Sequence, residues 1–321
     1  MARIPPPVAA IRTAVRRALP GDGLVLVACS GGADSLALAA AARFIGSQVG
    51  LITVDHGLQE GSDRRARSVA AWARDAGFDP VRIETVSVAG LPGGPEAAAR
   101  TARYAALDNA AAELGATAVL LGHTRDDQAE TVLLALARGA GPRGLAGMPA
   151  QRGVFRRPLL EVARSDTRKA CAALGLAPWE DPHNTDPAYA RSRVRASALP
   201  ALVGALGPAV VGNLARTASL AAADTAALDS LSATALEQAR SGTGLAVSVL
   251  AGQLPAIRSR VLHRWARELG APGGALAHRH VVALEALVTG WHGQGAVHLP
   301  GGIEVARRSG DLVRVVPTHI K

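Results

Sequence analysis

The feature that most constrains the fold is the alternation of short apolar runs with helix-like segments in the first half of the chain. The apolar runs lie at 24–29, 50–54, 81–88 and 118–121, and the helix-like segments at 35–45, 62–76, 95–114 and from 126 onward. Strands that are apolar on both faces and separated by helices are typical of a parallel, doubly wound sheet. We therefore predict an α/β fold for this half.

The second half of the chain has a different character. A loop rich in Gly, Pro and Arg at 138–153 is longer than a connector normally needs. The elements predicted after it are a strand at 155–160, a helix at 165–174 capped by Ser165, helical sequence over 198–240 that Pro200 and Gly207-Pro208 interrupt, helices at 256–269 and 278–288, and a hairpin of 296–299 with 303–307. We predict a large domain at 1–210 and a smaller helical and mixed domain at 211–321.

Polar residues cluster at the ends of three predicted strands. The clusters lie at 30–35, 55–58 and 122–131. In an open parallel sheet the carboxyl ends of the strands meet at one edge, and ligands bind beyond that edge. We therefore expect these three clusters to contribute to a single site.

Composition narrows the class of protein. Hydrophobic residues make up 49% of the 321 residues, which is enough for a buried core, and no apolar run is long enough for a membrane span. Arginines interleaved through the first twenty residues favour an amphipathic helix over a secretory signal. Cys29 and Cys171 have no paired spacing, which argues against a disulfide framework or a zinc ribbon. We therefore predict a cytoplasmic protein with no membrane partner.

Cations outnumber anions in the sequence. There are 35 Lys and Arg residues against 26 Asp and Glu, a net charge of +9, and nearly all of the cations are Arg. Arginine forks suit phosphate oxygens, so a polyanionic partner is one explanation. A composition rich in Ala, Gly and Arg also places arginine at ordinary surface positions, and charge alone leaves both explanations open.

The segment 30–35 (SGGADS) follows the first predicted strand and begins a helix. Two adjacent glycines remove side chains where backbone amides must approach phosphate oxygens, and serine hydroxyls and the helix N-terminus supply further donors. An ordinary tight turn is the alternative. The segment lacks the Gly-Lys-Ser/Thr of a Walker-type loop and the Gly-x-Gly-x-x-Gly of a dinucleotide site.

This segment resembles the phosphate loop of the N-type ATP pyrophosphatases, the PP-loop superfamily, which cleave ATP between its α and β phosphates. Further segments resemble the tRNA(Ile)-lysidine synthases, and the match extends over most of residues 24–200. These segments are VDHGL at 54–58, AARTARY at 98–104, GHTRDDQAET at 122–131, RGAG at 138–141, GLAGM at 144–148, RPLL at 157–160 and EDP at 180–182.

The resemblance implies a two-step reaction on the wobble cytidine of an isoleucine tRNA with a CAU anticodon. ATP first adenylates the ring carbonyl oxygen of the cytosine and releases pyrophosphate; the side-chain amine of free L-lysine then displaces AMP to form lysidine. The resemblance further implies ATP and Mg²⁺ as cofactors, catalysis by the domain at 1–210, and a small tRNA-binding domain with linking helices at 211–321. Whether the protein is a homodimer stays open.

The resemblance also implies roles at the predicted strand ends. Asp34, in a loop that has no lysine, would take part in catalysis as the ligand of a phosphate-bound Mg²⁺. Capping of the following helix is its structural alternative. The candidates for ATP binding are Ser30, Gly31, Gly32, Ala33, Asp34, Ser35, Asp55 and His56.

Asp127 and Glu130 lie three residues apart on one face of a predicted helix, and the resemblance assigns them to the amine of lysine. Asp126 and His123 lie beside them and are candidate substrate-binding residues. Stabilisation of the helix dipole is an alternative that explains the aspartates better than it explains Glu130. A structural hydrogen bond is an equal alternative for His123.

Several arginines complete the candidate site. Arg103 matches a family arginine that balances charge during adenylation, although a solvated arginine on a helix face is the alternative; Arg195 is also a candidate catalytic residue. The candidate tRNA-binding arginines are Arg138, Arg143, Arg157 and Arg193. The spacing of Arg191, Arg193 and Arg195 fits either an extended phosphate-contacting stretch or a solvated helix start.

Two positions depart from the family pattern, because Ser192 stands where an asparagine is expected and His183 where a serine is expected.

Three alternatives to lysidine formation also stay open. Enzymes that thiolate tRNA usually need catalytic cysteines, and amide-forming relatives need an ammonia source, which the sequence does not indicate. A non-catalytic nucleotide-binding or tRNA-binding module would not need the acidic pair Asp127 and Glu130.

Overall fold

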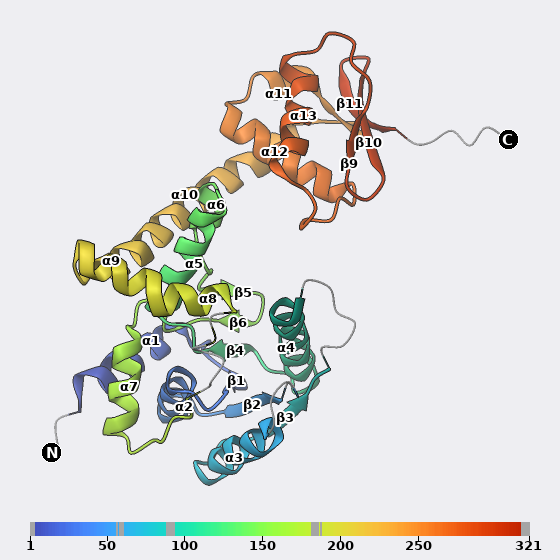
Figure 1. Cartoon of the computed structure of the whole chain (residues 1–321). Helices are drawn as coiled ribbons and strands as arrows, with labels where there is room; N and C mark the ends of the chain where they lie inside the picture. Colours follow the sequence, from blue (N-terminus) through green and yellow to red (C-terminus); the bar gives the residue numbers. More distant parts are fainter. Residues whose placement is uncertain are drawn as a thin grey trace. The chain divides into compact units, whose positions relative to one another are not determined.

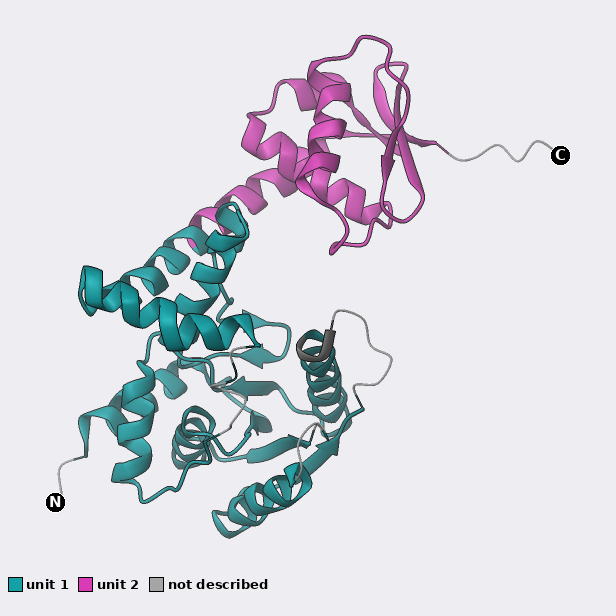
Figure 2. Cartoon of the chain, viewed as in Figure 1, with its two compact units in different colours: residues 1–222 teal, residues 223–321 magenta. Residues whose placement is uncertain are grey.

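The computed structural model describes residues 4–55, 57, 61–87, 94–180, 186 and 188–315 (Figure 1). The chain forms two compact units, residues 1–222 and 223–321 (Figure 2). The elements of the first unit are α1 (Pro6–Ala18), β1 (Val25–Ala28), α2 (Ala33–Ile45), β2 (Val49–Asp55), α3 (Ser62–Asp75), β3 (Val81–Thr85), α4 (Gly94–Glu113), β4 (Ala118–Leu121), α5 (Arg125–Ala137), α6 (Pro142–Leu145), β5 (Gln151–Arg152), β6 (Phe155–Arg156), α7 (Arg164–Ala173), α8 (Ala190–Arg193), the π-helical turn Val194–Ala198 and α9 (Leu199–Leu206). Helix α10 (Ala209–Ala239) begins in the first unit and ends in the second, which continues with β7 (Arg240–Ser241), β8 (Gly244–Ala246), α11 (Val247–Ala251), α12 (Pro255–Glu268), α13 (His278–Thr289), β9 (Val297–Leu299), β10 (Ile303–Arg308) and β11 (Asp311–Val315).

Within the described residues, the strands of the first unit form a sheet in the order β3-β2-β1-β4-β6-β5. The strands β3, β2, β1, β4 and β6 are parallel, and β5 pairs antiparallel with β6. The predicted parallel, doubly wound α/β fold is therefore confirmed. Because β1 and β4 are neighbours in the sheet, the residues that follow them meet at one edge.

Helices cover both faces of this sheet, because the side chains of the central strand alternate between two cores. Val25 and Val27 of β1 pack with α1, α2, α3 and α7 on one face. Leu26 packs with Leu107 and other residues of α4 on the opposite face. Leu26 and Val27 are both fully buried. This double burial explains why the strand reads as an unbroken apolar run.

Three details differ from the predicted elements. The Gly/Pro/Arg loop at 138–153 contains α6 and β5. Helix α7 begins at Arg164, and its N-cap is Ala163 rather than Ser165. Pro200 does not interrupt the helical segment, because the turn before it is π-helical and accommodates a residue that has no N–H.

The second unit has a core and a sheet of its own. Its described strands are antiparallel in the order β7-β8-β11-β10-β9, and the predicted hairpin of β9 and β10 is confirmed. The core joins α10, α12 and α13 to this sheet through fully buried leucines such as Leu236, Leu245 and Leu262. Strands β7 and β8 were not predicted, because runs of two and three residues carry little periodicity.

In the described part of the chain, no single helix has both the length and the apolar composition needed to cross a membrane. The helical segment Ala190–Leu206 and α10 meet those requirements only when taken together, and they are bent by 105° at the break between them.

Candidate active site

The loops that follow β1 and β4 approach each other closely. Gly122 follows β4, and a Cβ atom there would lie 3.1 Å from the backbone of Asp34 and Ser35. Gly31 has a φ of +84°, in the left-handed region that favours glycine, and a Cβ atom there would lie 2.9 Å from Val69. Gly122 therefore lets the end of β4 pack against the loop that follows β1, and Gly31 lets that loop pack against α3.

A cleft of about 430 Å³ opens beyond these strand ends. The predicted site residues that line it are Ser30, Gly32, Ala33, Asp34, Ser35, Arg103, His123, Asp127 and Arg195. The predicted site residues that do not line it are Gly31, Asp55, Asp126, Glu130, Arg138, Arg143, Arg157 and Arg193. The sheet therefore brings the loop 30–35 and the polar residues after β4 into one cleft, as predicted from the strand ends.

Arginine dominates the charge of this cleft. The arginines that line it are Arg65, Arg100, Arg103, Arg164, Arg168, Arg191 and Arg195. The acidic residues among the described lining are Asp34, Asp127 and Glu180. Clefts lined by one sign of charge concentrate ligands of the opposite sign, so this one suits a polyanion.

The loop 30–35 is held by internal hydrogen bonds. The hydroxyl of Ser35, at the start of α2, donates to the carbonyl oxygen of Gly32 at 2.9 Å and accepts from the amide of Ser30 at 3.2 Å. Ser35 is buried, whereas Ser30 is exposed. Ser35 thus shapes the loop from inside, and the loop backbone and Ser30 face the cleft at the N-terminus of α2, a site suited to phosphate.

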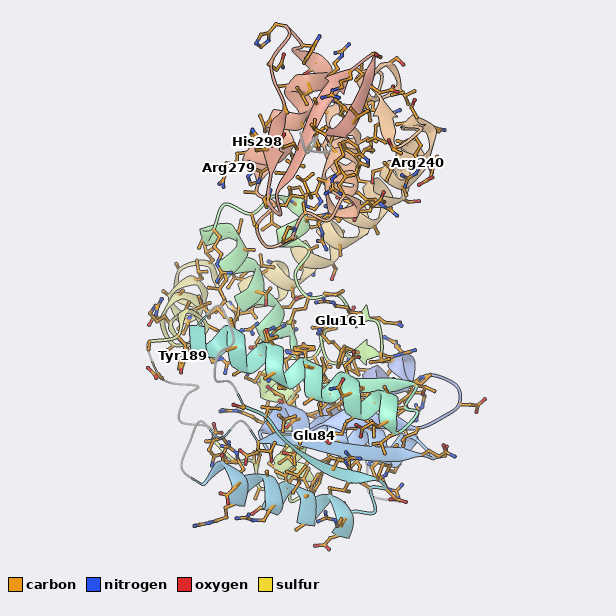
Figure 3. All side chains as sticks on the ribbon, turned by 90° about the vertical axis from the view of Figure 1, so that its right-hand side faces the viewer. Glu84, Glu161, Tyr189, Arg240, Arg279 and His298 are labelled. Carbon is orange, nitrogen blue, oxygen red and sulfur yellow. The ribbon has the colours of Figure 1, made fainter. Side chains whose placement is uncertain are left out.

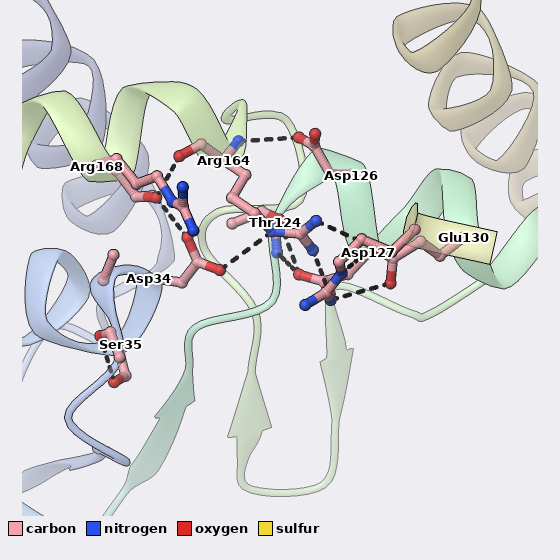
Figure 4. A network of polar contacts seen from close by, with 12 residues as sticks. Asp34, Ser35, Thr124, Asp126, Asp127, Glu130, Arg164 and Arg168 are labelled. Atoms are coloured by element: carbon pink, nitrogen blue, oxygen red, sulfur yellow. Dashed lines mark hydrogen bonds and ion pairs between the residues drawn. The ribbon is translucent and has the colours of Figure 1, made fainter. Parts of the chain in front are cut away.

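Asp127 and Glu130 lie in a network of ion pairs with three arginines (Figure 4). Arg164 donates to Asp127 Oδ1 at 2.8 Å and to Glu130 Oε1 at 3.0 Å. Arg191 donates to Glu130 Oε2 at 3.1 Å, and Arg195 donates to Glu130 Oε1 at 2.9 Å. Both carboxylates are buried, and Glu130 has no exposed surface. The predicted acidic pair therefore lies beneath a layer of guanidinium groups.

The environment of Asp127 favours its charged form. Burial alone would raise the pKa of Asp127, but Arg164, the backbone amide of Thr124 and Arg191 together lower that pKa below its ordinary value. Asp127 Oδ2 accepts from both the amide and the hydroxyl of Thr124 at 2.8 Å, which ties it to the start of α5. Helix capping and ion pairing therefore coexist in this residue.

Asp34 lies at the other end of the same network. Its Oδ1 accepts a short hydrogen bond from the Thr167 hydroxyl, and its Oδ2 lies 3.6 Å from Arg164 Nε (Figure 4). Burial, together with the nearby charge of Asp127, raises the pKa of Asp34 despite the opposing hydrogen bond from Thr167. A positive charge arriving with a ligand would therefore stabilise the ionised form.

Arg103 and His123 are partly buried in the cleft. Burial lowers the pKa of the Arg103 guanidinium, and the neighbouring cations Arg100 and Arg191 lower it further. Burial, helped by Arg103, also lowers the pKa of His123 to about 3, so its imidazole is neutral near pH 7. His123 Nδ1 is buried without a hydrogen-bond partner among the described residues. Both side chains suit contact with a ligand more than contact with water.

The predicted tRNA-binding arginines fall into two environments. Arg138, Arg143 and Arg193 are exposed, and Arg193 donates to the carbonyl oxygen of Ala188 at 3.0 Å. Arg157 is only 4% exposed, and it donates to the carbonyl oxygen of Pro149 and to the hydroxyl of Tyr104. A packing role is thus evident for Arg157, and its contact with tRNA stays a prediction.

Two further predicted residues, Asp55 and Asp126, accept hydrogen bonds from backbone amides. Asp55, at the end of β2, accepts from the amide of Gly57 at 3.0 Å, and Asp126 accepts from the amide of Arg164 at 2.9 Å. His56 and His183 lie outside the described residues. Ser192, which departs from the family pattern, is buried.

Sequence reasoning missed residues that the fold brings in from a distance. Arg164 and Thr167 belong to α7, more than thirty positions from Asp127, and no local pattern marks them. Trp179 lines the cleft beneath Arg65, whose guanidinium lies 3.7 Å from the ring centroid, and the amide of Trp179 donates to the carbonyl oxygen of Gly31. Arg191 and Arg195 lie four residues apart and therefore share one face of the helical segment. From the sequence they were not separated from Arg193, because the three arginines alternate at a spacing of two.

The two cysteines are poorly suited to thiol chemistry. Cys29 and Cys171 are buried, and their thiols lie against Ser35 Oγ and the carbonyl oxygen of Ala33, respectively. Burial raises the pKa of both thiols, that of Cys171 to about 11. A reactive thiolate needs a lowered pKa, so this environment argues against thiolation.

The fold and the cleft define a nucleotide-binding α/β protein of the PP-loop class. A family model described as PP-loop domain matches residues 10–202, and one described as TilS substrate binding domain matches residues 245–313. A tRNA(Ile)-lysidine synthase of Salinispora tropica is 67% identical over 99% of both chains, and one of Thermobifida fusca is 56% identical over 96% of this chain and 98% of that relative. The chain belongs to the tRNA(Ile)-lysidine synthase family, whose members are ligases with an ATP-using PP-loop domain.

A solved structure shows the same fold in a different protein. A U34-tRNA thiolase from Methanococcus maripaludis, which carries a [4Fe-4S] cluster, has a TM-score of 0.52 and 19% identity over 66% of this chain and 78% of its own. At this identity the likeness extends to the fold alone. No group of three or more His, Cys, Asp and Glu side chains suited to a metal ion occurs in the described residues.

Proposed function

We propose that this protein ligates L-lysine to the wobble cytidine of an isoleucine tRNA with a CAU anticodon and forms lysidine in the cytoplasm. The cytosine carbonyl oxygen attacks the α-phosphorus of ATP and expels pyrophosphate. The lysine side-chain amine then attacks the ring carbon that bears the adenylated oxygen, loses a proton, and expels AMP. The observation that carries the proposal is the single cleft that joins the loop 30–35 to the carboxylate and arginine network after β4.

The ATP half of the site consists of the loop 30–35, Asp34 and Arg103. Backbone amides at the start of α2 bind the phosphates, and Arg103 supports the negative charge that develops during adenylation. The desolvated position of Arg103 supports this role, because a guanidinium in such a place gains most from an anionic ligand.

Asp34 fits a Mg²⁺ ion that arrives with ATP. Mg²⁺ keeps several waters and is usually bound by one or two carboxylates together with substrate phosphates, so a complete protein cage is not required. Asp34 lines the cleft and has its pKa raised by burial and by Asp127, a setting that a cation would relieve. When bound, the ion would neutralise charge on the phosphates.

The lysine half consists of Asp127 and Glu130, with His123 and Asp126 beside them. The arginines on these carboxylates mean that the lysine ammonium must share or displace a guanidinium group. Neutral His123 has a ring nitrogen without a partner among the described residues, which suits a hydrogen bond with the substrate. Arg195 lines the same cleft and donates to Asp127, and its proposed role is to support the leaving AMP.

The tRNA contacts come from exposed arginines of the first unit and from the smaller domain, whose functional boundary we place at 211. Arg138, Arg143 and Arg193 are exposed in or near the loop after α5, where a phosphate backbone would reach them. Arg240, Arg279 and His298 lie at the surface of the second unit (Figure 3). Whether two copies of the chain associate is a further proposal, which measurement of the mass in solution would test.

The products derived from ATP test this mechanism. With ATP, Mg²⁺ and the substrate tRNA but no lysine, pyrophosphate should be released in an amount that does not exceed that of the tRNA. Addition of lysine should release AMP and permit turnover. Formation of ADP, or release of AMP that does not depend on lysine, would contradict the two-step mechanism.

A further inference from the structure

Arg164 links the two halves of the cleft through a single guanidinium group. Its Nη2 lies 2.8 Å from Asp127 Oδ1, its Nη1 lies 3.0 Å from Glu130 Oε1, and its Nε lies 3.6 Å from Asp34 Oδ2 (Figure 4). Asp34 belongs to α2 and the other two carboxylates to α5. The planar guanidinium presents its N–H donors in a fixed fork toward these carboxylates, whereas a lysine ammonium is a compact charge with rotatable donors.

The backbone of Arg164 is fixed to the same elements. Its amide donates to Asp126 Oδ2 at 2.9 Å, and the amide of Arg125 donates to the carbonyl oxygen of Val162 at 2.9 Å. One turn further along α7, the hydroxyl of Thr167 donates to Asp34, and its oxygen lies 2.7 Å from the carbonyl oxygen of Arg164. The first turn of α7 therefore holds the guanidinium in place at the centre of the network, where only 17% of the Arg164 side chain is exposed.

We propose that Arg164 is a positioning residue that couples ATP binding to lysine binding, an inference that rests on the proposed function. Its guanidinium contacts the two carboxylates that the lysine ammonium would bind. Phosphates that enter beside Asp34 offer the same guanidinium new anionic partners. The hold of Arg164 on Asp127 and Glu130 then weakens, and the two carboxylates attract the lysine ammonium more strongly.

The expected coupling is positive and reciprocal. A change in lysine affinity on ATP binding requires an equal change in ATP affinity on lysine binding, and such couplings are typically about 5- to 150-fold. Arg191 and Arg195 also contact Glu130, so the carboxylates keep cationic partners when Arg164 is replaced. Removal of Arg164 is therefore expected to reduce the coupling without leaving the carboxylates unpaired.

Calorimetric titration of lysine tests this proposal. The full chain with saturating substrate tRNA is titrated with and without a non-hydrolysable α,β-methylene analogue of ATP and Mg²⁺. In the wild type we expect the analogue to lower the Kd of lysine by on the order of 10-fold. In Arg164→Gln the ratio of the two Kd values should fall to about 1, and Arg164→Lys, which keeps the charge but loses the fork, should give an intermediate ratio.

Lys169→Gln is the matched control, because it removes one charge from the exposed face of the same helix outside the cleft. It should keep the wild-type ratio. Circular dichroism and thermal melting establish that each variant is folded. If Arg164→Gln does not fold, the comparison of Arg164→Lys with the wild type still tests the proposal. A wild-type ratio of 1, or an unchanged ratio in both Arg164 variants, would overturn the coupling role. Absence of lysine binding in the wild type would instead contradict the proposed function.

Discussion

At the scale of single residues, the most consequential group is Glu130. Its fully buried carboxylate accepts hydrogen bonds from Arg164, Arg191 and Arg195. A buried ion pair is not in itself strong evidence of stabilisation, but loss of one partner leaves the others uncompensated. The network is therefore more sensitive to removal of one member than its net contribution to stability suggests.

Replacement of Glu130 by glutamine should destabilise the protein by about 1–3 kcal/mol, because it leaves partly buried guanidinium groups without their shared carboxylate. Urea denaturation would measure this change. Glu161→Gln is the control, since Glu161 is exposed (Figure 3) and its replacement should change stability by less than about 0.5 kcal/mol. Equal effects of the two replacements would contradict the buried network.

His123 makes the stability of the protein depend on pH. Its pKa is lowered from the ordinary 6.5 to about 3, so the unfolded chain binds a proton more readily than the folded chain. The stabilisation is complete above pH 6.5 and is lost as the pH falls from 6.5 toward 3. Between pH 7 and 5.5 this loss amounts to about 1 kcal/mol. In His123→Gln the fall in unfolding free energy over that range should be smaller by this amount; identical slopes would contradict the assignment.

The sequence indicated Asp34, Asp127 and Glu130 because each lies in a short pattern beside a strand end. It did not indicate Arg164, since ion pairs across more than thirty positions depend on how α7 packs against α5. Burial of Arg157 was equally hidden, because a charged residue in a basic loop reads as solvated until its partners are known. Local chemistry was thus predictable, whereas the pairing of charges was not.

At the scale of elements, the order of strands decides which loops meet. The positions of β1, β2, β3 and β4 follow from apolar runs, and their parallel order follows from the helices between them. The strand predicted at 155–160 is present as β6 but is shorter than predicted, and helix α6 was not predicted, since an element of four residues has no measurable period. The cleft lies at the ends of strands whose apolar runs alternate with long helices, which explains why the location of the site could be predicted.

The segment after α5 is expected to contact tRNA through exposed arginines. Arg143→Ala should lower tRNA affinity for all sequences and reduce the salt slope of binding by about 1, the value expected for one phosphate contact. Filter binding at several salt concentrations would measure both quantities. Arg74→Ala, at the exposed end of α3, is the matched control and should change neither. An unchanged slope for Arg143→Ala would argue against phosphate contact.

At the scale of the whole molecule, each unit has a hydrophobic core of its own. Leu262 is fully buried in the second core, so Leu262→Ala should destabilise that unit by about 2–5 kcal/mol. Hydrogen exchange should speed up in α12 and α13, tRNA binding should weaken, and binding of the ATP analogue should be unchanged. Unchanged tRNA affinity would contradict a tRNA-binding role for the second unit.

The central claim is that one cleft uses ATP to join lysine to a tRNA anticodon, and incorporation of labelled lysine tests it most directly. Purified protein with ATP, Mg²⁺, labelled lysine and the CAU-anticodon isoleucine tRNA should transfer label to the RNA. The same tRNA with uridine in place of the wobble cytidine should remain unlabelled. No incorporation into an intact substrate tRNA, or equal labelling of the two RNAs, would contradict the proposed activity.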